Sequence, residues 1–535
     1  MAYVEIKNFC FAYNRQENIL NHINLTVNDG EIALVLGRTG SGKSTLLSQI
    51  KPELALKGTR SGTIDVNGTV GYVMQNPSHQ IVTPTVWQEL AFPLENQGVP
   101  PEQIRMKVAE MANFFGIADW FLRDISELSG GMRQMLNLAS AMLLSPDILV
   151  LDEPTSQLDP ISAVDFLEAV NKINRDLGVT VIITEHRLEE IYPLADRILL
   201  LEDKMISIDC PASEFANKLN ADNAVFKALP SPIRIYSKTK KGICPMTVRE
   251  GRIWLNHNFN KNSSENAESS KTETVAAKTK KSIKEPAMKV KNIYFAYERK
   301  AEDVLNDLSF NLYKGELLCL LGANSSGKTT LLKVISGLKK AYNGKIEILS
   351  KNIKKYSDSE LYGKTMSMLP QNPSILFKHD TVEQELKEIN PEYKKMSELL
   401  EIEHLISRHP YDLSGGEQQK LGLAKVLLND PKIILLDEPT KALDAEFKEH
   451  LANIFKKLCD SGVSILMATH DIEFAAMYAD RCLMMFDGSI AAQNPPREFF
   501  SGNHYYTTAA NRMARGIIPD AIICKDVIEY CEKSL

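Results

Sequence analysis

The sequence predicts an α/β fold that is built twice, in tandem, along a chain of 535 residues. A glycine-rich turn between an apolar strand and a helix start occurs once in each half of the chain. Each half also contains an apolar strand that ends in Asp-Glu-Pro. The matching motifs lie 285 residues apart, both from Lys43 to Lys328 and from Asp152 to Asp437. A constant spacing of this size indicates two copies of one fold.

The glycine-rich turn of the first half follows the apolar run at residues 32–36 and reads GRTGSGKST. A strand, such a turn and a helix start together direct backbone N–H groups and the positive end of a helix at one point, which suits a polyphosphate. We expect the lysine to reach the β- and γ-phosphates and the next hydroxyl to bind Mg²⁺. The alternative, a plain glycine turn with a surface lysine, is disfavoured by the recurrence. The predicted phosphate-binding residues are Gly37, Gly40, Gly42, Lys43, Ser44 and Thr45 in the first half, and Gly322, Gly327, Lys328, Thr329 and Thr330 in the second.

An aromatic residue precedes each glycine-rich turn at nearly the same distance. In the first half Tyr13 follows a predicted strand at residues 3–8, with a second strand expected at 23–27. Its counterpart in the second half is Tyr297. Either ring could be a packed strand residue, but the repeated position favours stacking on a purine.

A glutamine ends a predicted strand in each half. Strands are expected at residues 63–70 and 72–74, and Gln75 follows them; Gln371 is its counterpart. A glutamine placed there can complete a metal shell and orient water. A glutamine bonded to its own turn remains the alternative.

A Ser-Gly-Gly sequence opens a second helix in each half. Helices are predicted for residues 86–120, and a further helix runs from the Ser-Gly-Gly to Leu144. A helix that starts in this way offers a second anion-binding N-terminus, although a simple capped helix is the commoner outcome. The residues are Ser129, Gly130 and Gly131 in the first half, and Ser414, Gly415 and Gly416 in the second.

The apolar strand before each Asp-Glu pair makes a solvated acidic turn a poor explanation. Adjacent acids leave a strand in different directions and can therefore take different roles. We expect Asp152 and Asp437 to support the Mg²⁺ shell, and Glu153 and Glu438 to polarise the attacking water as general bases. A further apolar strand in each half ends in His186 or His470, for which a γ-phosphate contact is expected.

The overall composition limits the class of protein. The apolar fraction is 44%, the charged fraction is 24%, and the formal net charge is −6, so nucleic acid is not the favoured partner. Eight cysteines without a C-x-x-C pair indicate reduced thiols in a cytosolic protein. No apolar run approaches the 18 residues of a membrane-spanning helix, so a membrane role would require a partner.

The predicted domains are 1–229, an appendage and flexible linker at 230–287, 288–500, and a C-terminal extension at 501–535. The linker is expected to be flexible because its Asn/Ser/Lys/Glu/Thr-rich composition cannot bury a core. The two glutamines are 296 residues apart rather than 285, so the halves differ most around the helical insert, which is a candidate partner-facing region.

With these motifs in place, each half resembles an ABC-type ATPase over about residues 1–225 and 286–500. The resemblance implies two tandem P-loop ATPase domains, each with a RecA-like α/β core, an antiparallel β subdomain and an α-helical subdomain, with ATP and Mg²⁺ bound. The sequences QNPSHQ at 75–80 and TEHRLEE at 184–190, and the tail at 499–506, are similar to those of the fused double ATPase of an energy-coupling factor (ECF) importer. That family implies a motor on the cytoplasmic face of the membrane, an integral membrane coupling subunit and a small membrane subunit that captures a vitamin, vitamin precursor or metal ion.

The resemblance also implies that the halves pair head to tail, so that the phosphate loop of one half and the Ser-Gly-Gly of the other enclose one ATP. Both sites keep their glutamate and histidine, and we therefore expect both to hydrolyse ATP. Two departures bear on this expectation: Ser325 replaces the glycine found at position 40, and Met132 stands where a glutamine is more usual.

Two other functions fit part of this pattern. A double ABC protein acting on ribosomes would carry a long, charged, helical arm between its domains, whereas this linker has little helical periodicity. A nucleotide-switched scaffold without transport would be expected to lack catalytic acids, and both glutamates are present.

Overall fold

The computed structural model describes residues 3–13, 17–220, 223–259, 285–298, 301–323 and 326–534. Most of the predicted linker and Ser325 lie outside these ranges. The described chain forms two compact units: the first comprises Met1–Lys240, Cys244–Thr247 and Asp444–Glu446, and the second comprises Lys241–Ile243, Val248–Leu443 and Phe447–Leu535. Each unit is described by itself.

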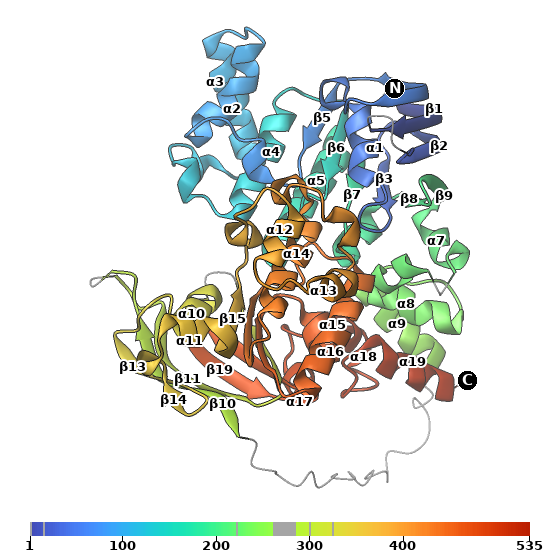
Figure 1. Ribbon diagram of the computed structural model, residues 1–535. Helices are drawn as coiled ribbons and strands as arrows, with labels where there is room; N and C mark the ends of the chain where they lie inside the picture. Colours follow the sequence, from blue (N-terminus) through green and yellow to red (C-terminus); the bar gives the residue numbers. More distant parts are fainter. Residues whose placement is uncertain are drawn as a thin grey trace. The chain divides into compact units, whose positions relative to one another are not determined.

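The first unit is organised around a six-stranded sheet in the order β5-β6-β7-β3-β8-β9, which is parallel except for β9 at its edge (Figure 1). The strand β3 lies at the centre, so the loop that follows it emerges beside the ends of its neighbours. The strands are β3 (Ile32–Leu36), β5 (Val70–Val73), β6 (Ile148–Asp152), β7 (Thr180–Thr184), β8 (Arg197–Glu202) and β9 (Met205–Pro211).

Both faces of this sheet are buried, which explains why its central strands are apolar throughout. Along β3, Ile32, Leu34 and Leu36 pack on one side, and Ala33 and Val35 pack on the other. The first side is covered by α4 (Gly130–Met142) and α5 (Pro160–Leu177), and the second by α1 (Lys43–Ile50).

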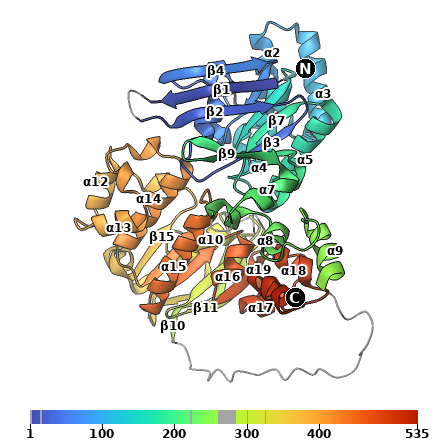
Figure 2. The same cartoon turned by 90° about the vertical axis from the view of Figure 1, so that its right-hand side faces the viewer.

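A three-stranded antiparallel sheet, β2-β1-β4 (Figure 2), packs over α1 through a shared apolar cluster. Its strands β1 (Tyr3–Ala12) and β2 (Leu20–Val27) extend further than the predicted ranges, whereas β4 (Thr59–Asn67) starts four residues before the predicted range 63–70 and ends three residues before its end. Two helices, α2 (Val86–Asn96) and α3 (Pro101–Phe114), form a separate apolar cluster with one side of α4. The unit ends with α6 (Leu188–Ile191), α7 (Ala212–Lys218) and α8 (Ser231–Thr239).

The second unit repeats this plan, with a six-stranded sheet in the order β15-β16-β17-β12-β18-β19 and a four-stranded sheet, β11-β10-β13-β14. The α/β fold class, with an antiparallel sheet and a helical part in each copy, is therefore confirmed. The strands are β10 (Pro286–Phe295), β11 (Leu305–Tyr313), β12 (Leu317–Leu321), β13 (Asn343–Ile348), β14 (Lys351–Asn352), β15 (Met366–Leu369), β16 (Ile433–Asp437), β17 (Ser464–Ala468), β18 (Arg481–Phe486) and β19 (Ser489–Asn494).

The helices of the second unit explain why the two glutamines are further apart than the other motifs. The extra residues before Gln371 form β14, the one-turn helix α11 (Asp358–Glu360) and a π-turn at Leu361–Thr365. The residues missing after it shorten the helical insert to α12 (Val382–Lys387) and α13 (Lys394–Leu399). The remaining helices are α10 (Lys328–Ile335), α14 (Gly415–Leu428), α15 (Ala445–Asp460), α16 (Ile472–Tyr478), α17 (Pro496–Gly502), α18 (Ala509–Ala514) and α19 (Cys524–Lys533).

The segment after α8 forms α9 (Val248–Phe259), which belongs to the second unit and packs on α18 of the C-terminal extension. Trp254, Leu255 and Phe259 are buried there. Within the described ranges, none of the helices has the length and apolarity needed to cross a membrane.

Candidate functional site

The glycine-rich loop of each unit leaves the end of the central strand and runs directly into a helix. Gly42 caps α1 with φ of 101°, and Gly327 caps α10 with φ of 102°. Residues other than glycine rarely adopt this left-handed backbone conformation. Lys43 Nζ turns back and donates to the carbonyl oxygens of Gly37 and Arg38 at 2.9 and 3.0 Å. Lys328 donates in the same way to Gly322 and Ala323 at 2.9 and 3.0 Å. Both ammonium groups therefore lie over their own loops.

In the first unit, the acids predicted from the sequence lie beside this loop. Asp152 Oδ1 accepts hydrogen bonds from Ser44 Oγ at 3.0 Å and from Thr184 Oγ1 at 2.9 Å. Strand β6 thus connects to the first turn of α1 and to the end of β7. These are oxygen groups of the kind that Mg²⁺ prefers.

Glu153 holds the remaining two predicted residues of this site together. Gln75 Nε2 donates to Glu153 Oε2 at 2.6 Å, and His186 Nε2 lies 2.8 Å from Glu153 Oε1. Glu153 has a positive φ of 44°, and Glu438 has one of 53°. Such a backbone is strained for a glutamate and is a frequent feature of functional sites. It turns the second acid of each pair away from the first.

The surroundings of Glu153 and Asp152 shift their protonation in opposite directions. Burial acts to raise the pKa of Glu153, but the charge and hydrogen bond of His186 outweigh it, so the pKa is lowered overall. Burial and the neighbouring Glu153 raise the pKa of Asp152. Burial lowers the pKa of Lys43. Glu153 is therefore held ionised, as a group that accepts a proton from water must be.

The second unit contains the same residue types in a different hydrogen-bond pattern. His470 Nε2 lies 3.1 Å from Lys328 Nζ and 3.4 Å from Glu438 Oε1. Gln371 is exposed, and no hydrogen bond joins it to Glu438 within the described residues. Burial raises the pKa of Glu438 to about 7 and also raises the pKa of Asp437. The two units thus differ at the glutamate although their sequences match there.

The two predicted stacking residues take matching places. Tyr13 Oη lies 3.1 Å from Thr45 Oγ1, and Tyr297 Oη lies 3.0 Å from Thr330 Oγ1. Each ring also makes an edge-to-face contact with the phenylalanine two residues before it. Half of the Tyr297 side chain remains exposed. Each tyrosine therefore presents its ring at the helix that begins with the loop lysine.

The Ser-Gly-Gly sequences start α4 and α14. Ser129 Oγ accepts from the backbone N–H of Met132 at 3.2 Å, as a capping serine does. Ser414 forms a full capping box with Glu417, whose carboxylate accepts from both the Ser414 backbone N–H and its hydroxyl at 2.8 Å. Within the described part of each unit, no hydrogen bond joins this serine to the phosphate loop of the same unit.

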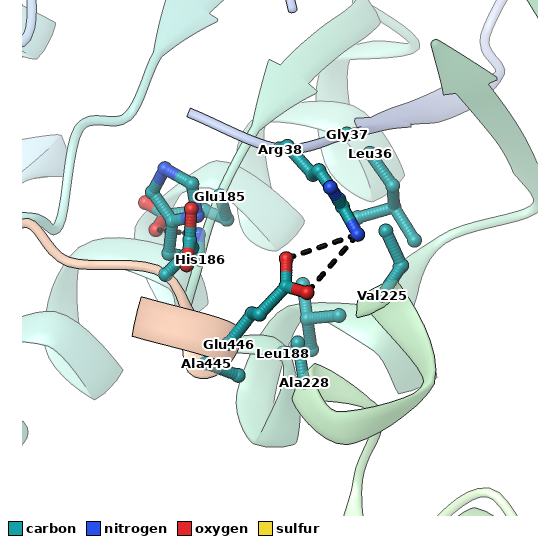
Figure 3. A pocket seen from close by; sticks show the side chains of 11 residues that line it. Leu36, Gly37, Arg38, Glu185, His186, Leu188, Val225, Ala228, Ala445 and Glu446 are labelled. Atoms are coloured by element: carbon teal, nitrogen blue, oxygen red, sulfur yellow. Dashed lines mark hydrogen bonds and ion pairs between the residues drawn. The ribbon is translucent and has the colours of Figure 1, made fainter. Parts of the chain in front are cut away.

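Two residues of these sites were given no role in the sequence analysis. Glu417 is one, and its spacing from Ser414 could have identified the capping box. Glu185 is another: it is fully buried, it accepts from the Thr155 backbone N–H at 2.8 Å, and burial raises its pKa to about 7. A small cavity of about 30 Å³ lies next to Gly37. Figure 3 shows Glu185 and His186 among the residues that line it, with Val225 and Ala228 on another side.

Comparisons with known proteins agree with this repeated site. The ABC transporter family model matches residues 20–156 and 305–441. A protein of Bacillus thuringiensis subsp. konkukian, provisionally named an ABC transporter ATP-binding protein, is 39% identical over all of this chain and 99% of its own length. A Bacillus subtilis protein, provisionally named the HMP/thiamine import ATP-binding protein YkoD, is 31% identical over 93% of this chain and 92% of its own length.

A solved structure also covers both units. It contains an archaeal ribosome recycling factor, aABCE1, in complex with the ribosomal stalk protein aP1; the similarity covers 92% of this chain and 91% of that one, with 20% identity and a TM-score of 0.57. At this identity, the similarity concerns the fold alone.

Proposed function

Because this chain belongs to the ABC transporter family, we propose that it is the motor subunit of an importer of the ECF type. The coarser part of this statement follows from the family itself: the chain is an ABC-type ATPase that binds ATP with two ATP-binding domains. ATP-binding subunits of ABC transporters work with membrane subunits. The proposal concerns the kind of importer, the cargo and the roles of individual residues.

The residues of each loop fit Mg²⁺ as well as ATP. A hydroxyl and a carboxylate meet beside the first loop, and beside the second Asp437 Oδ2 is buried without a hydrogen-bond partner among the described residues. Ser44, Gln75 and Asp152 would hold the ion in the first site, and Thr329, Gln371 and Asp437 in the second. Mg²⁺ would neutralise charge that develops on the phosphates.

The other residues of the first site would bind the phosphates and activate the attacking water. Lys43 would release its two loop carbonyls and bind the β- and γ-phosphates, for which its buried ammonium is already placed. Glu153 would accept the proton of the attacking water, and Gln75 and His186 would hold the glutamate and contact the γ-phosphate. Lys328, Glu438, Gln371 and His470 would take these roles in the second site.

The two Ser-Gly-Gly helix starts support the head-to-tail pairing that the family uses. Each serine caps its own helix and makes no hydrogen bond to the loop of its own unit among the described residues, which leaves both helix starts available to a nucleotide held by the other half. Loss of the γ-phosphate would weaken that attraction and allow the halves to separate.

The import of a vitamin, vitamin precursor or metal ion is proposed on one observation: a full-length relative bears the name of an HMP/thiamine import ATP-binding protein. The motor would associate peripherally with the cytoplasmic face of the membrane, through an integral coupling subunit and a separate substrate-capture subunit.

Affinity isolation of the tagged chain from detergent-solubilised membranes tests this proposal. We expect an integral membrane protein to be recovered with the chain, and to be lost from a matched isolation in which the membranes were omitted. Recovery with ribosomes alone would reject import and favour the second candidate, a double ABC protein that acts on ribosomes. That candidate is supported only by the similarity in fold to aABCE1.

A further inference from the structure

The side chain of Gln80, the last residue of the sequence QNPSHQ, folds back on the strand that precedes this sequence. Its Oε1 accepts a hydrogen bond from the Met74 backbone N–H at 3.0 Å, and its Nε2 donates to the Tyr72 carbonyl oxygen at 3.1 Å. One amide can make both bonds because it carries an acceptor as well as donors. Strand β5 ends at Val73, so Gln80 holds the backbone at the point where Gln75 follows.

Two amides on α4 hold the same segment from the other side. Gln134 is fully buried, and its Nε2 donates to the Met74 carbonyl oxygen at 3.0 Å. Asn137, also fully buried, donates to the Pro77 carbonyl oxygen at 3.2 Å. Both backbone groups of Met74, the residue before Gln75, are therefore bonded to side chains.

These bonds leave the backbone of Gln75 little freedom. The peptide group that joins Met74 to Gln75 is the one whose carbonyl oxygen Gln134 binds. From this position Gln75 Nε2 donates to Glu153 Oε2 at 2.6 Å. A side chain on a backbone that is already fixed loses less conformational entropy when it binds its partner. The segment thus prepares the contact between the glutamine and the proposed general base.

The second unit cannot form the bond between Gln80 and Met74, because both of its groups are missing. By the spacing of 296 residues between the two glutamines, Pro370 stands at the position of Met74. Leu376 stands at the position of Gln80. Proline has no N–H to donate, and leucine has no amide to accept it. The glutamine that follows the proline, Gln371, is exposed.

The helix that faces this turn differs between the units as well. On α14, Gly422 takes the place of Asn137, and a Cβ atom there would lie 2.8 Å from the Cβ of Pro373. The turn therefore packs directly on the helix. The buried glutamine of α14, Gln419, donates to the Glu438 carbonyl oxygen at 3.4 Å rather than to the turn.

We infer that Gln80 is a positioning residue of the first nucleotide site, which acts through Gln75 by fixing the backbone from which that glutamine reaches Glu153. This inference rests on the proposed roles of Gln75 and Glu153 in ATP hydrolysis. Loss of a neutral hydrogen bond of ordinary strength corresponds to a change of roughly 2- to 10-fold, which is the loss of first-site turnover expected without the Gln80 amide.

The substitution Gln80→Leu tests this role in the full chain. It introduces the residue that the second unit carries at this position, so the fold accommodates it. We expect steady-state phosphate release at saturating MgATP to fall 2- to 10-fold in the Glu438→Gln chain, where turnover depends on the first site. Ser78→Ala is the matched control, because Ser78 is exposed in the same turn, and it should leave turnover unchanged.

A second substitution, Gln75→Ala, separates positioning from a general effect on stability. If Gln80 acts through Gln75, adding Gln80→Leu should lower the residual turnover of Gln75→Ala no further, because the two effects are not additive. The same comparison in a chain that retains Glu438 gives the same result if the two sites turn over only together.

A further loss in the double variant equal to the loss in Gln80→Leu alone would show that Gln80 only stabilises the unit. Unchanged turnover in Gln80→Leu would show that its bonds do not act on the site. Either result would overturn the inference. Absence of phosphate release from the unmodified chain would instead reject the assignment of ATP hydrolysis on which the inference rests. None of these results depends on whether the chain drives import.

Discussion

At the scale of single residues, the two glutamates show how one sequence motif can have two protonation states. Glu153 and Glu438 both follow a buried aspartate at the end of a parallel strand. Glu153 is bonded to Gln75 and contacts His186 at 2.8 Å, whereas Glu438 is buried, with His470 shared between it and Lys328. The immediate partners of each carboxylate therefore decide whether it is ionised near pH 7.

This difference predicts that the two sites respond differently to pH. With Glu153→Gln the remaining hydrolysis depends on Glu438, whose pKa is about 7, and it should fall by about tenfold from pH 8 to pH 6 because only the ionised carboxylate can accept a proton. With Glu438→Gln it depends on Glu153, whose pKa is lowered, and it should change little over that range. Steady-state phosphate release at saturating MgATP measures both.

The double variant Glu153→Gln with Glu438→Gln is the control, and it should bind ATP while losing at least about 100-fold in turnover. Identical pH profiles for the two single variants would contradict the prediction. The raised pKa of Glu438 also affects stability: its contribution is present at low pH and is lost as the pH rises through about 7, so Glu438→Gln should remove that dependence.

At the scale of secondary-structure elements, the two helical inserts are joined to their cores by different chemistry. In the second unit Lys425 on α14 forms an ion pair with Glu385 on α12, and both side chains are buried. Lys425 also donates to the Leu376 carbonyl oxygen at 2.7 Å. In the first unit the corresponding acid, Glu89, binds the backbone N–H groups of residues 82 and 83, and Ser140 takes the place of the lysine.

Breaking this ion pair should destabilise the second insert. Lys425→Met leaves Glu385 buried without its counter-charge, which costs roughly 3–5 kcal/mol, whereas Ser140→Ala in the first unit removes a single neutral hydrogen bond worth about 1 kcal/mol. Hydrogen exchange of peptides from α12 and α14 in the full chain measures the first change, and peptides from α2 and α4 measure the second.

The contribution of this ion pair to stability also depends on pH. Burial acts to raise the pKa of Glu385, but Lys425 and the backbone N–H groups of residues 378 and 379 outweigh it, so the pKa is lowered. The contribution of the pair is therefore present at neutral pH and is lost as the pH falls through that lowered value. Equal protection in Lys425→Met and the unmodified chain would show that the pair does not hold the insert.

At the scale of the whole molecule, the path of the chain between its repeats is unusual. After α8, which packs on the first unit, the chain forms α9 as part of the second unit before it enters the segment at 260–284. Residues 248–259 precede the second ATP-binding domain in sequence, yet they pack on the helices that follow it.

This path predicts that a chain cut after α9 holds together. With a site for a specific protease inserted between residues 262 and 283, cleavage leaves α9 on the N-terminal fragment and α18 on the C-terminal one. The two fragments should elute together in size-exclusion chromatography without nucleotide, because the buried face of α9 stays packed on α18.

Two substitutions on α9 sharpen this test. Leu255→Asp places a charge on a fully buried position and should release the fragments, whereas Ile253→Asp changes a position that is 60% exposed and should not. Separation of the unmodified fragments, or the same behaviour in both variants, would contradict the prediction.

The sequence by itself determined the α/β class, the duplication and the residue types that meet at each loop, because these depend on local patterns: apolar runs of strand length, glycines before a helix and acids at strand ends. It also indicated where the halves diverge, around the helical inserts. It could not show that Gln75 meets Glu153 while Gln371 stays exposed, or that Lys425 lies against Glu385. Such contacts are decided only by tertiary structure, because pairing, burial and protonation depend on neighbours that come from distant parts of the chain.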